Sequence, residues 1–410
     1  MTDKLEKIRY FLLVVLIIIF PLNQQIHLRP FPNVEGVIID YLITKISLPE
    51  MLLIIFSFFN IPNIYKSLRY QLQINKFGIF LLIVSFLMLV LNTFRSEFIN
   101  LAIYENLILL LIGLNSLTIK TYSKINLSFV LANSLKFWMS VLLLLGLLQV
   151  YFQESFFDNY YYFGEFTYSS DNYHIKQDGF IFDKLIPAYG IFSHSNIYGA
   201  FFLLSSMLLH LIKKNTSFFV LLGISGVILS GSLNILIGMI LFLIFYYLKI
   251  DLRIIILYPI FLFLFLNWGS LNYLSYVDDL SVYRRLYMIH LSNTKFIEDP
   301  INFIFGFGYY NYFRVVSDNL FLYEIIRFFQ PPHNVFYLII WNYGLLFLLT
   351  FLIIFFKLIK NTDYDSKLVF LILISISMLD HFLFTNHQLK MLLFLLLPYS
   401  LFKVSSIKIK

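Results

Sequence analysis

Residues 335–356 read VFYLIIWNYGLLFLLTFLIIFF and carry no charged side chain. An α-helix rises 1.5 Å per residue, so this run is long enough to cross the hydrocarbon core of a bilayer, about 30 Å thick. Similar apolar runs lie along the rest of the chain, at 9–22, 49–63, 77–93, 98–118, 137–153, 190–212, 217–231, 233–249, 253–268, 367–380 and 388–403. The pattern predicts an all-α, polytopic membrane protein with about 12 transmembrane helices.

The overall composition favours the same class. Of 410 residues, 60% are hydrophobic and 13% are charged, about half the roughly 25% charge of a typical soluble domain. We therefore expect a single integral membrane domain over 1–410, with a retained first helix rather than a cleaved signal peptide. Because the chain has no cysteine, a disulfide framework, a thiolate nucleophile and a cysteine-ligated metal are excluded.

The positions of the basic residues predict the orientation. If the N-terminus is cytoplasmic, the short outer connections hold four, namely Arg29, Lys45, Arg95 and Lys390. The cytoplasmic segments hold nineteen: Lys4, Lys7, Arg9, Lys66, Arg69, Lys76, Lys120, Lys124, Lys136, Lys213, Lys214, Lys249, Arg253, Lys357, Lys360, Lys367, Lys403, Lys408 and Lys410. This bias predicts a multi-pass membrane protein with both termini in the cytoplasm. The net charge of +7 then reflects topology and not nucleic-acid binding.

Two long segments on the predicted outer side, 154–189 and 269–334, hold most of the remaining charge. Long loops without secondary structure are uncommon unless they are functional, so we expect an extracytoplasmic active site there. Residues 34–48 are apolar but contain Asp40 and Lys45, which favours an interfacial helix over a full span.

The strongest local motif is Gln330-Pro331-Pro332-His333-Asn334, directly before the run at 335–356. Two prolines predict a helix start, where free backbone N–H groups favour an anion. His333 would act there as a general base or as a hydrogen-bond partner of a phosphate or a sugar hydroxyl. The alternative is a helix cap with an interfacial histidine.

Arg284 and Arg285 form a pair in the second long segment. The planar guanidinium group matches phosphate oxygens, so the pair is suited to a phosphate or a pyrophosphate. The alternative is a salt bridge to Asp278 or Asp279.

A third motif, GIFSHSN at 190–196, opens an apolar run. Gly190, His194 and Asn196 would line the same outer surface as His333, or else Asn196 would hydrogen-bond between helices. Asp380 and His381 lie in the last outer connection, where they support the site or cap helices.

Several function classes are disfavoured by what the sequence lacks. There is no phosphate-binding glycine loop, and Asp278–Asp279 lacks the ligand spacing of a metal site. Charged residues do not recur through the apolar runs as an ion or proton pathway requires. A polysaccharide flippase or another transporter is therefore the weaker alternative, and a structural scaffold leaves the arginine pair unexplained.

Taken in order, these motifs resemble the O-antigen polymerase and O-antigen ligase superfamily of membrane glycosyltransferases. The resemblance covers about 190–350 and rests on GIFSHSN (190–196), SGS (230–232), Arg285, EDPINFIFGFG (298–308) and HNVFYLIIWNYGLL (333–346). It implies a helical fold of the type-C glycosyltransferase kind and a polyprenyl-diphosphate-linked oligosaccharide as donor. It also implies that Arg285 contacts the lipid diphosphate and that His333 is catalytic or orients the substrate.

The same resemblance implies that Asn334, Gly190 and Asn196 shape the site. The chain departs from the family pattern at Pro187 and Leu233, where such proteins often have arginine, so we expect either that Lys184 or Arg284 substitutes or that the exact activity differs. No metal or other cofactor is expected, because arginines can stabilise a diphosphate leaving group without a metal.

The resemblance leaves two acceptors open. A polymerase extends another lipid-linked repeat unit and can work together with a chain-length regulator, whereas a ligase transfers polymer to the lipopolysaccharide core. We favour the polymerase because polymerases are the more divergent in sequence and this chain is divergent.

Overall fold

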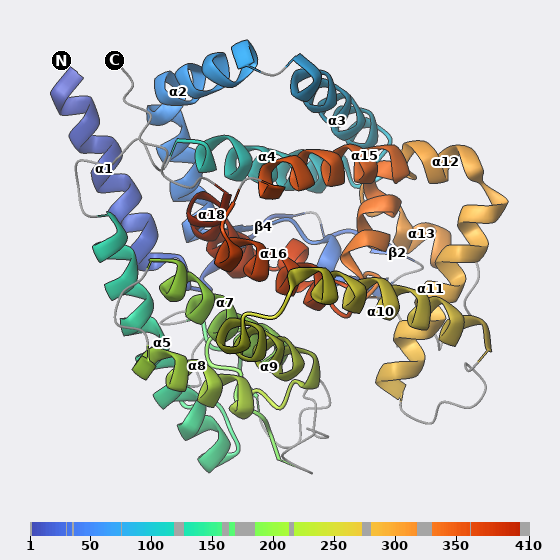
Figure 1. Cartoon of the computed structure of the whole chain (residues 1–410). Helices are drawn as coiled ribbons and strands as arrows, with labels where there is room; N and C mark the ends of the chain where they lie inside the picture. Colours follow the sequence, from blue (N-terminus) through green and yellow to red (C-terminus); the bar gives the residue numbers. More distant parts are fainter. Residues whose placement is uncertain are drawn as a thin grey trace.

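The computed structural model describes residues 2–29, 31–34, 37–74, 76–118, 127–157, 164–168, 185–212, 217–272, 280–317, 330–360 and 362–401. The prediction of an all-α protein is confirmed, and every predicted apolar run contains a helix (Figure 1). These helices are α1 (Thr2–Ile19), α2 (Leu48–Ile74), α3 (Lys76–Phe94), α4 (Ile99–Ser116), α5 (Leu127–Phe152), α7 (Ser195–Ile212), α8 (Ser217–Leu229), α9 (Leu233–Leu248), α10 (Leu252–Asn272), α15 (Val335–Lys360), α16 (Tyr364–Ser377) and α18 (His387–Leu401).

Within the described residues, five helical segments are long and apolar enough to cross a membrane. They are Leu48–Arg69, Ile99–Ser116, Leu127–Phe152, Ser195–Ile212 and Val335–Lys357. Further apolar helices, such as Leu233–Leu248, are shorter. The structure thus supports a membrane protein, while the count of about 12 spans remains a prediction.

The expectation of an interfacial helix over 34–48 is wrong. The chain forms short antiparallel pairs here, with β1 (Gln25–His27) against β4 (Lys45–Ser47) and β2 (Asn33–Val34) against β3 (Val37–Ile38). A single 3-10 turn, η1 (Asp40–Leu42), interrupts them. The segment is rich in valine and isoleucine, whose branched side chains favour strands over helices.

The predicted outer segment 269–334 is largely helical where the structure describes it. It continues α10 and adds α11 (Leu280–Glu298), α12 (Pro300–Phe305) and α13 (Tyr312–Ser317). The end of α3 holds the α12 turn, because Asn92 Nδ2 donates to Phe305 O at 2.7 Å and Arg95 donates to Gly306 O at 2.7 Å. The described part of the segment is therefore packed against α3 and not a loose loop.

Helix α15 is broken at Gly344, which has φ 87° and ψ 165°. A Cβ at this position would lie 2.5 Å from Gly306 N, so the backbone of the α12 turn lies directly against the glycine. Only glycine adopts this backbone conformation readily. The apolar run predicted as one helix consequently consists of a short first segment that follows His333 and a longer second segment that packs against α3.

Buried apolar residues form two clusters. The first is built mainly on α1, α5, α7, α16 and α18, with α7 at its centre, and 83% of the α7 span is buried. The second is built on α11, α13 and the first segment of α15, and includes Trp341. The two motifs that contain candidate site residues lead into different clusters. GIFSHSN runs into the start of α7, which packs in the first cluster, and QPPHN precedes α15, whose first segment packs in the second.

Candidate functional site

Asp380 lies in the connection between α16 and α17 (Phe382–Thr385), and only 5% of its surface is exposed. Its Oδ2 accepts a hydrogen bond from Asn196 Nδ2 at 3.1 Å, and its Oδ1 accepts one from His381 N at 2.8 Å. His333 Nδ1 lies 3.7 Å from Oδ1. One carboxylate thus joins the start of α7, the start of α15 and the α16–α17 connection.

The sequence allows two interpretations of the QPPHN motif, a helix cap and a functional histidine, and each applies to a different residue. Asn334 caps α15, because its Oδ1 accepts from Phe336 N at 2.9 Å and from Tyr337 N at 3.3 Å. His333 is left free of the capping role, and its Nε2 lies 2.9 Å from Gln330 Oε1. The imidazole therefore has one nitrogen toward Gln330 and the other toward Asp380.

The GIFSHSN motif is held in place by Gln149 on α5. Gln149 Nε2 donates to Gly190 O at 2.8 Å, and Gly190 N donates to Gln149 Oε1 at 2.7 Å, while Gly190 has φ +58°. His194 Nδ1 then accepts from Asn196 N at 3.1 Å at the start of α7. These contacts hold the start of α7, from which the Asn196 side chain reaches Asp380. Asn196 therefore both hydrogen-bonds between segments and lies beside the carboxylate that His333 approaches, so the two interpretations of this residue hold together.

Arg284 and Arg285 lie half-buried on α11. Arg285 is near enough to Asp380 and His381 for its charge to lower the pKa of both groups. Its buried Nε has no hydrogen-bond partner among the residues that the structure describes. Lys184 and the alternative partners Asp278 and Asp279 lie outside the described residues.

The electrostatics keep this cluster in a defined protonation state. Burial alone would raise the pKa of Asp380, but the approach of His333 and the charges of His381 and Arg285 outweigh burial, so the pKa of Asp380 lies well below its ordinary value. Burial, together with the charges of His333 and Arg285, lowers the pKa of His381 to about 3. At neutral pH, Asp380 is therefore an anion and His381 is neutral.

His333, Asp380 and His381 offer three ligand atoms within 4.8 Å of one another, a grouping that can hold a metal ion. Two imidazoles and a carboxylate suit zinc and other transition metals. The sequence does not predict this group of possible metal ligands, because His333 and Asp380 lie 47 positions apart and only packing brings them together. The positive charge of Arg285 beside the set opposes a second cation.

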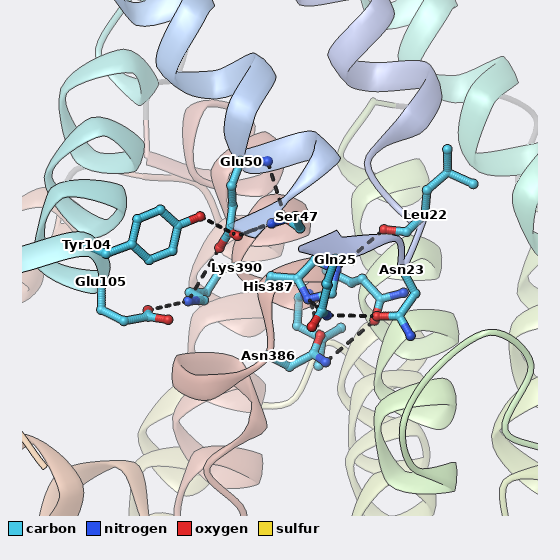
Figure 2. A network of polar contacts seen from close by, with 12 residues as sticks. Leu22, Asn23, Gln25, Ser47, Glu50, Tyr104, Glu105, Asn386, His387 and Lys390 are labelled. Carbon is cyan, nitrogen blue, oxygen red and sulfur yellow. Dashed lines mark hydrogen bonds and ion pairs between the residues drawn. The ribbon is translucent and has the colours of Figure 1, made fainter. Parts of the chain in front are cut away.

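A second polar cluster, unexpected from the sequence, lies between α2, α4 and α18 (Figure 2). Lys390, 2% exposed, places Nζ 2.6 Å from Glu105 Oε2 and 3.7 Å from Glu50 Oε1. Glu50 Oε2 also accepts from Tyr104 Oη at 2.9 Å. Glu50, Glu105 and Lys390 thus bring charged groups from three predicted apolar runs together, and Lys390 is a buried residue of α18 rather than part of a short outer connection.

Comparisons with protein-family models, with curated proteins and with solved structures find no match for this chain. The functional argument therefore depends on the motifs and on the geometry around Asp380.

Proposed function

We propose that this chain is a membrane glycosyltransferase that polymerises a surface polysaccharide, O-antigen, capsule or exopolysaccharide, at the outer face of a bacterial inner membrane. The observation that carries the proposal is the carboxylate of Asp380, which joins Asn196 to His333 with the charge of Arg285 nearby. Two motifs chosen separately for their chemistry thus meet at one buried anion, and Arg285 is near enough to act on its charge. Such convergence of a histidine, a carboxylate and an arginine is typical of an active site.

The reaction transfers a glycan from a polyprenyl diphosphate carrier. The oxygen of an acceptor sugar hydroxyl forms a bond to the anomeric carbon of the donor, and the bond from that carbon to the diphosphate oxygen breaks. The electron pair leaves with the polyprenyl diphosphate, whose developing charge Arg285 stabilises. The hydroxyl proton moves to His333, and attack from the face opposite the leaving group inverts the anomeric configuration.

Asp380 acts as a positioning residue. With a proton on Nδ1, His333 points that N–H toward the carboxylate, and Nε2 is the nitrogen that receives the acceptor proton. Gln330 Oε1 can only accept, so its 2.9 Å contact with Nε2 corresponds to the protonated Nε2–H after the transfer. Asn196 and the backbone of His381 fix the carboxylate in turn.

We further propose that the transfer needs no metal ion. A metal held by His333, Asp380 and His381 would occupy the imidazole that serves as the base. Activity that survives EDTA supports this arrangement, and a strict requirement for a divalent metal would contradict it.

The first test is substitution of Arg285→Ala, His333→Ala and Asp380→Asn in cells, with polysaccharide examined on a gel and insertion of the protein checked. We expect losses of about 10²–10³-fold for Arg285→Ala and about 10²–10⁴-fold for His333→Ala. Arg29→Ala and His27→Ala are matched controls, because both side chains are exposed on the same predicted side. Normal polymer from the Arg285 and His333 variants would remove the proposed site.

The product that accumulates separates the candidate acceptors. A deletion strain that accumulates single repeat units indicates a polymerase, whereas long polymer free of the lipopolysaccharide core indicates a ligase. A flippase is distinguished by repeat units that remain on the cytoplasmic side.

A further inference from the structure

A cavity of about 310 Å³ opens between the 95–98 connection and helices α11, α12 and α13. Its lining mixes carboxylates, amides, cations and one aromatic ring, and includes Glu97, Lys295, Glu298, Asn302, Phe307 and Arg314. The size lies at the lower end of small-ligand pockets, roughly 300–1,000 Å³. The Asp380 cluster described above does not contribute to this lining.

The polar groups of the cavity are held in place before any ligand binds. Arg314 Nε donates to Glu97 Oε2 at 2.9 Å, and Lys295 Nζ donates to Glu298 Oε2 at 2.8 Å. Glu97 N donates to Asn311 Oδ1 at 2.9 Å, which fixes the connection against α13. Both glutamates use Oε2 in these bonds, and within the described residues Oε1 of each has no hydrogen-bond partner. The Glu97 and Glu298 side chains are 53% and 55% exposed, so the second oxygen of each is accessible to a ligand.

This lining fits a saccharide better than an ion. Sugar hydroxyls both donate and accept, so they pair with carboxylates, amides and cations placed side by side. Phe307 adds an apolar surface, and its ring is fixed by packing against Trp341 with centroids 4.4 Å apart. Lys295 and Arg314 offset two of the three carboxylates of the lining, which are Glu97, Glu298 and Asp299, and this weakens the attraction of the cavity for a metal cation.

The cavity is also linked to the first segment of α15. Phe307 N donates to Trp341 O at 3.0 Å, and Trp341 lies six residues after Val335, about 9 Å along the helix. His333 directly precedes that helix. The cavity and His333 are therefore attached to the same helical segment, and a glycan held in the cavity has to span at least this axial length to reach His333.

We propose that this cavity is a saccharide-binding subsite that holds the acceptor glycan while its terminal hydroxyl reacts. This inference rests on the proposed glycosyltransferase function, and it assigns acceptor binding to Glu97, Glu298 and the residues around them. The subsite contributes affinity for the acceptor and leaves the chemical step to the Asp380 cluster.

The test is direct binding to the purified full-length protein in detergent. The probe is the repeat-unit oligosaccharide released by mild acid from the lipid carrier of the host strain, and saturation-transfer NMR and calorimetry report its binding. The proteins compared are the wild type, Glu97→Gln/Glu298→Gln, His333→Ala and Glu154→Gln. Glu154 is exposed and lies outside the cavity, so it controls for the same chemical change.

We expect the wild type, Glu154→Gln and His333→Ala to bind the oligosaccharide alike, and the double variant to bind it at least tenfold more weakly. Equal binding by the double variant and the wild type, no binding by the wild type, or binding of Ca²⁺ without the oligosaccharide would overturn the subsite.

The same variants separate this inference from the proposed catalysis. If the double variant binds normally while His333→Ala abolishes polymer, the subsite fails and the catalytic proposal stands. If binding depends on the cavity while His333→Ala makes normal polymer, the saccharide site stands, but its role as acceptor subsite for His333 fails with the catalytic proposal.

Discussion

Asp380 is the central residue of the candidate site, because hydrogen-bond donors and charged groups surround its carboxylate. Asn196, His333 and Arg285 among them come from distant parts of the chain. Asn196 and the His381 backbone donate to the carboxylate, and His333 faces it. A buried carboxylate without such partners would be costly. The site therefore depends on Asp380 remaining ionised, and on His381 remaining neutral beside it.

His381 makes a specific contribution to pH dependence. Its pKa is lowered from 6.5 to about 3 in the fold, so below pH 6.5 the unfolded chain binds a proton that the folded chain does not. Stability therefore falls as the pH drops from 6.5 toward 3. Asp380, whose pKa is lowered from 3.8, keeps its stabilising contribution above pH 3.8 and does not interfere in this range.

We predict that His381→Gln flattens the dependence of stability on pH between about pH 7 and about pH 5, by on the order of 2 kcal/mol at the lower limit. Thermal unfolding of the purified protein at several pH values measures this difference against the wild type. Parallel pH profiles for the two proteins would mean that His381 is not held neutral in the fold.

The sequence identified most residues of the site one at a time, but not their arrangement. His333, Arg285 and Asn196 stood out by chemistry and by their places in motifs, while Asp380 was expected either to support the site or to cap a helix. Its role depends on a contact with Asn196, 184 positions earlier in the chain. Such a contact is set by helix packing, which single-sequence patterns do not encode.

At the scale of elements, the break in α15 at Gly344 decides where His333 lies relative to the second segment of the helix. The backbone of the α12 turn packs against the glycine, so a side chain here has both strained dihedral angles and no space. Gly113 in α4 is a matched control, because an added Cβ there has no atom within 4 Å.

We predict that Gly344→Ala lowers stability by at least about 1–3 kcal/mol from backbone strain alone, whereas Gly113→Ala is neutral or slightly stabilising. Melting temperatures of the two purified variants test the difference. An unchanged melting temperature for Gly344→Ala would show that α15 is not broken in this way.

Lys390 links three helices through its two carboxylate partners. We predict that Lys390→Met, which leaves Glu50 and Glu105 buried without their cation, destabilises the protein by about 3–5 kcal/mol. Adding Glu105→Gln should recover part of this loss, because only one buried charge then remains. The same substitution at the exposed Lys360 is the control, and equal melting temperatures for the two lysine variants would refute a structural role for the buried cluster.

Helix positions were predictable because runs of apolar residues are a direct consequence of the lipid environment. The breaks and the short strands were not predictable by the same rule. The kink at Gly344 needs a second segment to pack against it, and the β1–β4 pair joins residues 18 to 22 positions apart. Both are products of tertiary contact rather than of local periodicity.

At the scale of the whole molecule, the candidate site lies where the two apolar clusters meet. Asn196 comes from α7 in the first cluster, and His333 precedes α15, whose first segment lies in the second. A site between two packed bodies is a common place for ligand binding, since each body fixes its own side chains. The distribution of basic residues places this region on the extracytoplasmic side, which remains a prediction from sequence.

The most direct test of the central claim is reconstitution of the purified protein in liposomes with polyprenyl-diphosphate-linked repeat units. The account predicts a ladder of longer glycans with release of polyprenyl diphosphate, unaffected by EDTA, and no ladder from His333→Ala or Arg285→Ala protein of equal stability. A wild-type protein that extends nothing, or variants that extend glycans as well as the wild type, would contradict it.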